Sequence, residues 1–115
     1  SNYDWGQDLK RLAEWVEVKG IEKIYVDYFG GLGIDPEYSL RERYIPWRGS
    51  SSWEFREMKK SDPKDFPRGN YLAVSATFLQ GGSWRDGFFE NDYAWLDGKE
   101  PVAKAGSSIF IYYIK

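Results

Sequence analysis

Three aspartates are the residues of this sequence whose type and spacing could support acid–base chemistry. Asp4 and Asp8 stand four residues apart, which would place both carboxylates on one side of a helix, and Asp27 follows within a later hydrophobic run. A pair of carboxylates can hydrolyse a glycosidic bond, one as the acid and the other as the base or nucleophile. A small carboxylate-dependent hydrolase is therefore one hypothesis for the function.

The same aspartates also have a simpler structural interpretation. Asp4, with Gln7 three residues later, is typical of a helix N-cap with a capping box. Asp8 then stands in the first turn, where the helix dipole favours an acid. Asp27 is unusual because aspartate is depleted in strands, so it lies either at an exposed edge or, if buried, beside a partner such as Lys23 or an arginine.

Other kinds of site are excluded or disfavoured by composition. The chain has no cysteine and no histidine, which excludes disulfides, thiolate chemistry, histidine triads and the usual zinc sites. No oxygen-ligand loop for a hard cation and no phosphate-binding glycine motif is present, so neither a metal nor a cofactor is expected. The net charge is −2 and the sequence shows no basic stripe, which argues against a nucleic-acid partner.

The first helix is the clearest element that the sequence predicts. Apolar residues recur at helical spacing on one face: Leu9, Leu12, Ala13 and Val16. Gly20 stands where a helix-ending glycine belongs, and Ile21 after it is placed to contact Val16, as in a Schellman motif. We therefore expect a helix over residues 7–18.

The remaining pattern predicts an α/β domain. Residues 23–29 form a strand with Ile24, Val26 and Tyr28 on one face, and residues 107–114 form a final strand. Residues 70–80 are almost continuously apolar, which indicates a central strand buried on both faces. Short helices are expected at 35–41 and 91–96, and an edge strand at 52–58. We expect one domain over residues 1–115, with about four strands in a small mixed or parallel sheet, helices packed on it, and a partly Rossmann-like order.

This arrangement predicts where a ligand would bind. If the strands at 23–29 and 70–80 are parallel, their carboxyl ends share an edge with the start of the first helix, and ligands of open α/β sheets bind at that edge. Together with Asp27, the candidate ligand-binding residues at this edge are Asp4, Trp5, Gln7, Asp8, Tyr28, Phe29, Thr77 and Gln80.

Aromatic residues form 19% of the chain, and most are expected to fill the core. Four tryptophans stand in turn-like or edge contexts: Trp47, Trp53, Trp84 and Trp95. Exposed rings of this kind are used by sugar-binding modules, or they contact another domain. A carbohydrate-binding module with exposed Trp and Tyr is therefore an alternative function.

Four stretches carry a resemblance to a known family. They are SNYDWGQDLKRL at residues 1–12, IYVDYFG at 24–30, YLAVSATFLQG at 71–81 and EPVAKAG at 100–106. In this order they resemble the C-terminal soluble region of multi-pass bacterial membrane proteins related to the dolichyl-phosphate-mannose–protein mannosyltransferases. Residues 41–65 lie outside the resemblance, and Phe78 departs from it, because a polar residue such as Asn is expected there.

The resemblance implies a role for the domain within a larger protein. It implies an extracytoplasmic domain that follows the transmembrane portion of a lipid-carrier-dependent glycosyltransferase-like protein. Sugar transfer from a polyprenyl phosphate would be carried out by membrane-embedded acidic residues, which this sequence does not contain. The expected role is acceptor binding, positioning or structural support without catalysis. The partners are then the transmembrane portion and a glycan or polyprenyl-phosphate sugar.

Overall fold

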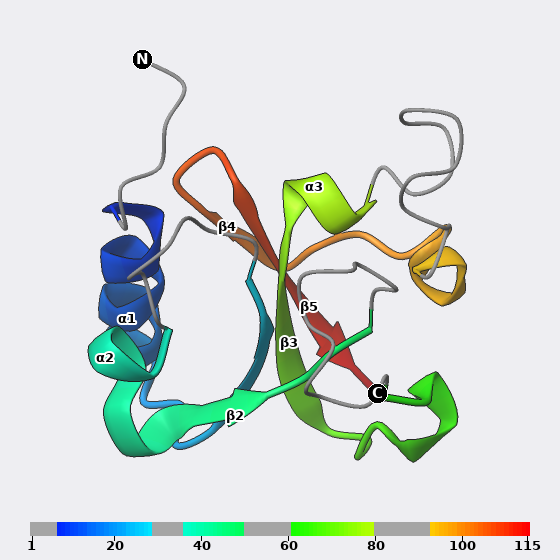
Figure 1. Ribbon diagram of the computed structural model, residues 1–115, viewed down its shortest axis with the longest axis horizontal. Helices are drawn as coiled ribbons and strands as arrows, with labels where there is room; N and C mark the ends of the chain where they lie inside the picture. Colours follow the sequence, from blue (N-terminus) through cyan, green and yellow to red (C-terminus); the bar gives the residue numbers. More distant parts are fainter. Residues whose placement is uncertain (1–6, 29–35, 50–60, 80–92) are drawn as a thin grey trace.

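The computed structural model describes residues 7–28, 36–49, 61–79 and 93–115, which form a mixed five-stranded sheet with helices packed on it (Figure 1). The strands are β1 (Ile24–Asp27), β2 (Tyr44–Pro46), β3 (Asn70–Ser75), β4 (Ala103–Ala105) and β5 (Ile109–Ile114). Their order in the sheet is β2-β1-β3-β5-β4. β1 is parallel to both β2 and β3, whereas β5 is antiparallel to β3 and to β4. The predicted α/β class with a mixed sheet is confirmed, with five strands rather than about four.

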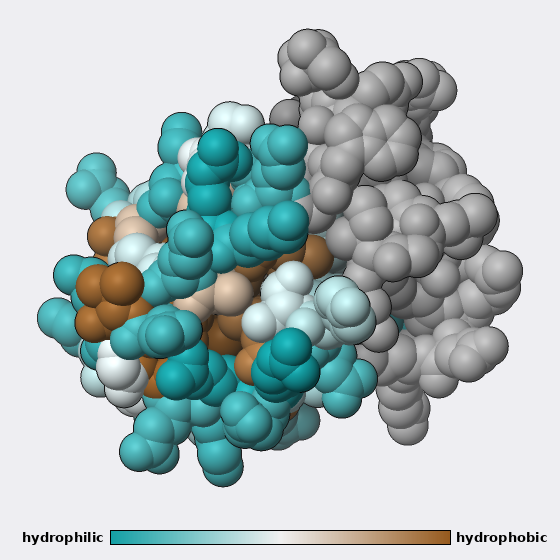
Figure 2. Space-filling model, turned by 90° about the vertical axis from the view of Figure 1, so that its left-hand side faces the viewer, coloured by the Kyte–Doolittle hydropathy of each residue, from teal (hydrophilic) through white to brown (hydrophobic). Residues whose placement is uncertain are grey.

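Two helices cover one face of this sheet. α1 (Gln7–Lys19) and α2 (Pro36–Leu40) lie side by side on the left of Figure 1, and a 3-10 turn, Arg41–Arg43, leads from α2 into β2. Two further 3-10 turns, Pro63–Asp65 and Ala94–Leu96, lie toward the other side. The outer side of the helices is mainly hydrophilic, with separate apolar patches (Figure 2). This is the pattern expected of amphipathic helices that bury one face against a sheet.

α1 begins and ends close to where the sequence predicts. Leu9, Leu12 and Val16 are buried on its inner face. Gly20 takes φ +70°, a conformation that favours glycine, and its N–H donates to Glu17 O. The N–H of Ile21 donates to Val16 O, 3.0 Å away. These two hydrogen bonds form the predicted Schellman ending, which pairs carbonyls that would otherwise lack an intrahelical partner.

The sheet separates two clusters of buried residues. On the helix side, α1 packs against Ile24, Val26 and Tyr28 of the β1 segment and against alternate residues of β3 and β5. On the other side, Leu72 and Val74 of β3 join a second cluster. Burial on both faces of β3, and the shared face of Ile24, Val26 and Tyr28, are therefore confirmed.

The second cluster is mainly aromatic and is centred on Phe66, which is 2% exposed. The Phe66 ring lies 4.8 Å from that of Tyr25, 5.0 Å from Trp47 and 6.2 Å from Trp95, measured between centroids. Trp47 is only 7% exposed, so the expectation that it presents an exposed ring is wrong. Its position after the short strand β2 resembles a turn in sequence, but its backbone N–H bonds to Val26 O of β1 and its ring packs against Tyr25 and Phe66. Trp95 is half-buried, and Trp53 and Trp84 lie outside the described residues.

The expected strands differ from the structure in their bounds and number: β1 covers Ile24–Asp27 rather than 23–29, and β5 covers Ile109–Ile114 rather than 107–114. The strand expected over 70–80 ends at Ser75, and Ala76–Leu79 forms the short helix α3. Ser75 pairs with Ile109, the first residue of β5, and the Ala76 N–H donates to Ser108 O in the same register before the chain continues as α3. β2 and β4 were not predicted, because three residues are too few for an alternating pattern. The expected strand at 52–58 lies outside the described residues.

The two short helices agree in part with expectation. α2 covers Pro36–Leu40 with Glu37 in its first turn, as predicted, while the expected cap Asp35 lies outside the described residues. Within the segment expected to be helical at 91–96, the described part is the 3-10 turn Ala94–Leu96.

Candidate functional site

The sheet contains a point where successive parallel strands are added on opposite sides. The chain passes from β1 to β2 on one side and then to β3 on the other side of β1. In open α/β sheets, ligands bind outside the carboxyl ends of the two strands at such a switch point. Asp27 and Val74 are paired at the carboxyl ends of β1 and β3. The candidate site is therefore the edge that Asp27, Tyr28 and Ser75 share.

Asp27 is buried at this edge, with 4% exposure. Its Oδ2 accepts hydrogen bonds from the Gly49 N–H at 3.0 Å and from the Tyr93 hydroxyl at 2.6 Å. The exposed-edge interpretation of Asp27 is thus wrong, and Lys23, one of the partners considered, is exposed. One carboxylate oxygen joins the end of β1 to the chain after β2 and to a residue 66 positions away in sequence.

A glycine is required at position 49 because the contact leaves no room for a side chain. A Cβ at this position would overlap the Tyr93 hydroxyl and would stand 3.0 Å from Trp47 Nε1. The backbone N–H of residue 49 reaches Asp27 because no side chain keeps Tyr93 away. Among the described residues, the buried Trp47 Nε1 has no hydrogen-bond acceptor. The contacts of Asp27 with Gly49 and Tyr93 therefore lie in a tightly packed part of the core.

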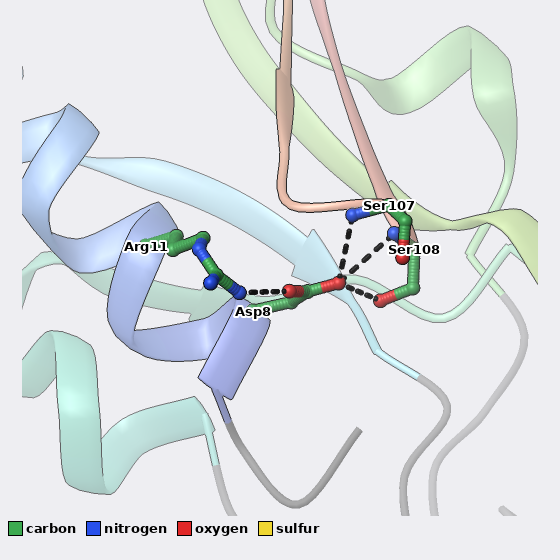
Figure 3. Close-up of polar contacts among 4 residues, drawn as sticks. All are labelled: Asp8, Arg11, Ser107 and Ser108. Atoms are coloured by element: carbon green, nitrogen blue, oxygen red, sulfur yellow. Dashed lines mark hydrogen bonds and ion pairs between the residues drawn. The ribbon is translucent and has the colours of Figure 1, made fainter. Parts of the chain in front are cut away.

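Asp8 lies at the same edge, at the start of α1 (Figure 3). Its Oδ2 accepts hydrogen bonds from the Ser107 N–H at 3.1 Å, the Ser108 N–H at 2.9 Å and the Ser108 hydroxyl at 2.6 Å. Its Oδ1 accepts from Arg11 Nη1 at 2.9 Å. Burial by itself would raise the pKa of Asp8, but the hydrogen bonds from Ser108, Ser107 and Arg11 together hold that pKa below its usual value.

The turn that receives Asp8 is shaped for a carboxylate. Gly106 has φ +64°, and a Cβ there would overlap the Asp8 carboxyl group. Successive backbone N–H groups in a turn of this kind form a concavity that favours an anion. Since Ser108 O also accepts from the Ala76 N–H at 2.7 Å, the turn joins the start of α1 to the end of β3. We refer to this set of contacts, Asp8 with Ser107 and Ser108, as the Asp8 latch.

The sequence-predicted residues fall into three groups. Asp8 and Asp27 are buried at the shared edge, and Tyr28 is buried in the helix-side core cluster. Gln7 is exposed at the first position of α1, and Thr77 lies in α3 at the end of β3. Asp4, Trp5, Phe29 and Gln80 lie outside the described residues. The described candidates therefore share one edge, and the two carboxylates there act as internal hydrogen-bond acceptors.

Five partners of these carboxylates were missed: Arg11, Gly49, Tyr93, Ser107 and Ser108. Gly49 and Tyr93 have no local signal, because they lie 22 and 66 positions from Asp27. The run Gly106-Ser107-Ser108 before a hydrophobic strand is a turn signature that could have indicated a hairpin and a set of free N–H donors.

Metal ligands and membrane spans were also sought in the described ranges. Residues 7–28, 36–49, 61–79 and 93–115 contain no group of three or more His, Cys, Asp or Glu side chains that could hold a metal ion. In the same ranges, no helix has the length and apolar character needed to span a bilayer. Comparisons with protein-family models, curated proteins and solved structures gave no match.

Proposed function

We propose that this domain is an accessory, non-catalytic part of a polytopic membrane protein related to lipid-carrier-dependent glycosyltransferases. In this proposal it lies on the extracytoplasmic side of the membrane and binds or positions the acceptor, or supports the structure of the parent protein. The single observation that carries the non-catalytic role is the use of the two described candidate aspartates, Asp8 and Asp27, as internal acceptors. The proposal that the domain belongs to such a parent protein rests on the sequence resemblance.

The state of Asp8 argues against the hydrolase alternative. A glycosidase needs one carboxyl group that stays protonated near neutral pH, which requires a raised pKa. The pKa of Asp8 is lowered, and its Oδ2 is held by three donors from Ser107 and Ser108. A carboxylate so held is ionised at neutral pH and is poorly placed to exchange a proton with a substrate.

The strand order supports a binding or positioning role. The parallel part, β2-β1-β3, has the order found around the switch point of doubly wound folds, and we interpret the domain as Rossmann-like in that part. A fixed edge at the switch point is a suitable platform for an acceptor chain. The carbohydrate-binding alternative is less well supported, because Trp47 and Trp95 pack on Phe66 instead of projecting from the surface.

The proposal is tested in the full-length parent protein. We expect the parent to fractionate with membranes and to transfer sugar from a polyprenyl-phosphate donor. Replacing residues 1–115 by a flexible linker should raise the apparent KM for the acceptor while slow hydrolysis of the donor continues. Loss of donor hydrolysis as well, or an unchanged acceptor KM, would contradict an acceptor-positioning role.

The isolated domain separates the alternatives. Its tryptophan fluorescence should change on titration with the acceptor, and it should show no hydrolase or transferase activity. A response to free glycans of many kinds would favour a carbohydrate-binding module. Hydrolysis of a glycoside by the isolated domain, abolished by Asp27→Asn without loss of fold, would establish the enzyme alternative.

A further inference from the structure

Three aromatic side chains meet on the helix side of the sheet, at the end opposite to the candidate site. Tyr71, near the start of β3, is paired directly with Tyr113 of β5, and their ring centroids lie 4.9 Å apart with an angle of 53° between the planes. Trp15 of α1 makes an edge contact with Tyr71, with the centroids 5.7 Å apart and an angle of 76°. We call the three rings of Trp15, Tyr71 and Tyr113 the aromatic surface.

The fold leaves the aromatic surface partly open to solvent. Trp15 and Tyr71 are half-buried, whereas Tyr113 is 39% exposed. Ile111, two residues earlier on the same face of β5, is fully buried, so the covered part of this face ends between Ile111 and Tyr113. The Tyr113 hydroxyl lies over the turn at Gly69, where an added Cβ would stand 3.9 Å from its oxygen. An aromatic face with a hydroxyl at its rim is therefore accessible to a ligand.

Two basic residues lie beside the exposed ring of this surface. Lys115 follows Tyr113 by two positions, and residues at this spacing share one face of an extended chain. Arg68 precedes Gly69, over which the Tyr113 hydroxyl lies. Both basic side chains are exposed, and within the described ranges neither is paired with a carboxylate.

The α1 side of the aromatic surface adds another positive charge. The exposed Lys19 lies one helical turn after Trp15 and so shares its side of the helix. Glu14 and Glu17 stand one and two positions from Trp15, and residues at these spacings do not face each other on a helix. The charges placed next to the three rings are therefore mainly positive.

We propose that the aromatic surface binds an acidic saccharide. The C–H bonds on one side of a pyranose ring carry partial positive charge and pack against the negative face of an aromatic ring. A carboxylate or phosphate of the same saccharide would bind Arg68 and Lys115 through charge-assisted hydrogen bonds. The inference goes beyond the proposed function, because it needs no other part of the parent protein.

The size of the aromatic surface favours a saccharide over a protein partner. A Tyr or Trp side chain has about 150–250 Å² of surface to bury, so two half-buried rings and Tyr113, at 39% exposure, present about 200 Å² together. A specific protein interface buries about 800 Å² on each partner. The accessible aromatic area falls well short of such an interface and matches the face of a small saccharide.

The binding is measured by amide chemical shifts of the ¹⁵N-labelled 115-residue chain. Trigalacturonate supplies carboxylates, glucose 1-phosphate supplies a phosphate, and maltotriose is the neutral probe. At least one acidic probe should shift the amides around Gly69 and Tyr113 and should bind about tenfold more tightly than maltotriose, because hydrogen bonds between charged groups are strong. The probe that responds identifies the acidic group.

Variants of the surface separate stacking from charge. Tyr113→Ala should weaken binding about tenfold, the effect of losing one stacked ring, while Tyr113→Phe should keep most of the affinity. Tyr38→Ala is the matched control, because Tyr38 is 84% exposed on α2 and is not part of the aromatic surface. Arg68→Gln should remove most of the preference for the acidic probe.

Three results would overturn the proposal: no shifts around Gly69 with either acidic probe, equal affinity for neutral and acidic probes, or equal losses in Tyr38→Ala and Tyr113→Ala. These results concern the isolated chain, whereas the proposed function is tested by membrane fractionation and acceptor KM of the parent. Failure of the acidic-saccharide site is therefore distinguishable from failure of the proposed function.

Discussion

Replacement of Asp8 by alanine should destabilise the domain strongly at neutral pH. The variant removes one acceptor that serves two backbone N–H groups and the Ser108 hydroxyl, and leaves those donors beside a cavity. A hydrogen bond to a charged group contributes about 1.5–3 kcal/mol, and bonds that share one acceptor are not additive. The ion pair with the largely exposed Arg11 adds at most about 0.5 kcal/mol. We expect the free energy of unfolding to fall by about 3 kcal/mol.

The loss should depend on pH in a defined direction. The pKa of Asp8 is lower in the folded protein than the usual value of 3.8, so the unfolded chain takes up its proton first as the pH falls. The contribution of the carboxylate is therefore complete well above pH 4 and is lost as the pH falls through the lowered pKa. The difference between the wild type and Asp8→Ala should accordingly shrink in acid.

Urea unfolding followed by tryptophan fluorescence, at pH 7 and in acid, measures both effects. Glu14→Ala is the control, because Glu14 is exposed on the same helix and its loss should change stability by less than about 0.5 kcal/mol. Ser108→Ala should lose part of the stability and should couple to Asp8→Ala in a double-mutant cycle. A loss at Asp8 no larger than that at Glu14, or a loss independent of pH, would refute the latch.

Three further predictions concern other close contacts. Gly106→Ala should cost more stability than Gly98→Ala, by about 2 kcal/mol, because both glycines have positive φ but only at Gly106 would a Cβ overlap Asp8. Asp27→Asn and Tyr93→Phe should each cost about 2 kcal/mol in urea unfolding and should be strongly non-additive, since they share one buried hydrogen bond. Burial, with a smaller effect of the Asp97 charge, raises the pKa of Tyr112. The stability of the fold should therefore fall as the pH rises above the usual tyrosine value of 10.0 and through the raised pKa. Tyr112→Phe should remove that part of the loss of stability.

Each of these predictions has a definite contrary result. Equal costs at the two glycines would mean that the hairpin turn moves away from Asp8 without penalty. Additive losses for Asp27→Asn and Tyr93→Phe would mean that the two side chains stabilise the fold independently. The alkaline transition is monitored by tyrosine absorbance and tryptophan fluorescence. If the Tyr112→Phe variant shows the same transition as the wild type, the transition belongs to other tyrosines.

The elements that sequence predicts well are those whose signals are local. The apolar spacing of α1 and the glycine at its end lie within one stretch of chain, and so does the alternation of Ile24, Val26 and Tyr28. β4 has no such signal, because a three-residue strand is stabilised by its pairing with β5 and not by its own pattern. The end of β3 was missed for a related reason: the apolar run continues, but the partner strand begins at Ile109 and the ladder stops there.

The candidate site was predictable in location but not in chemistry. Its location follows from parallel strands and a helix start, which are properties of the topology. The roles of the two carboxylates depend on contacts with Tyr93, 66 positions from Asp27, and with Ser108, 100 positions from Asp8. No periodicity reports on pairs so far apart, so the sequence favoured a structural role for Asp8 without indicating its distant partners, and it left the surroundings of Asp27 open.

These two long-range contacts together constrain what the edge can do. Asp8 ties the first turn of α1 to the turn before β5, and Asp27 ties the end of β1 to Gly49 and Tyr93. A buried carboxyl group is stable only while its hydrogen-bond partners stay in place, so neither contact opens without a large cost. Under the proposed function, an acceptor would meet an edge at which Asp8 and Asp27 already accept internal hydrogen bonds. Such an edge is suited to holding an acceptor in place while another part of the protein supplies the chemistry.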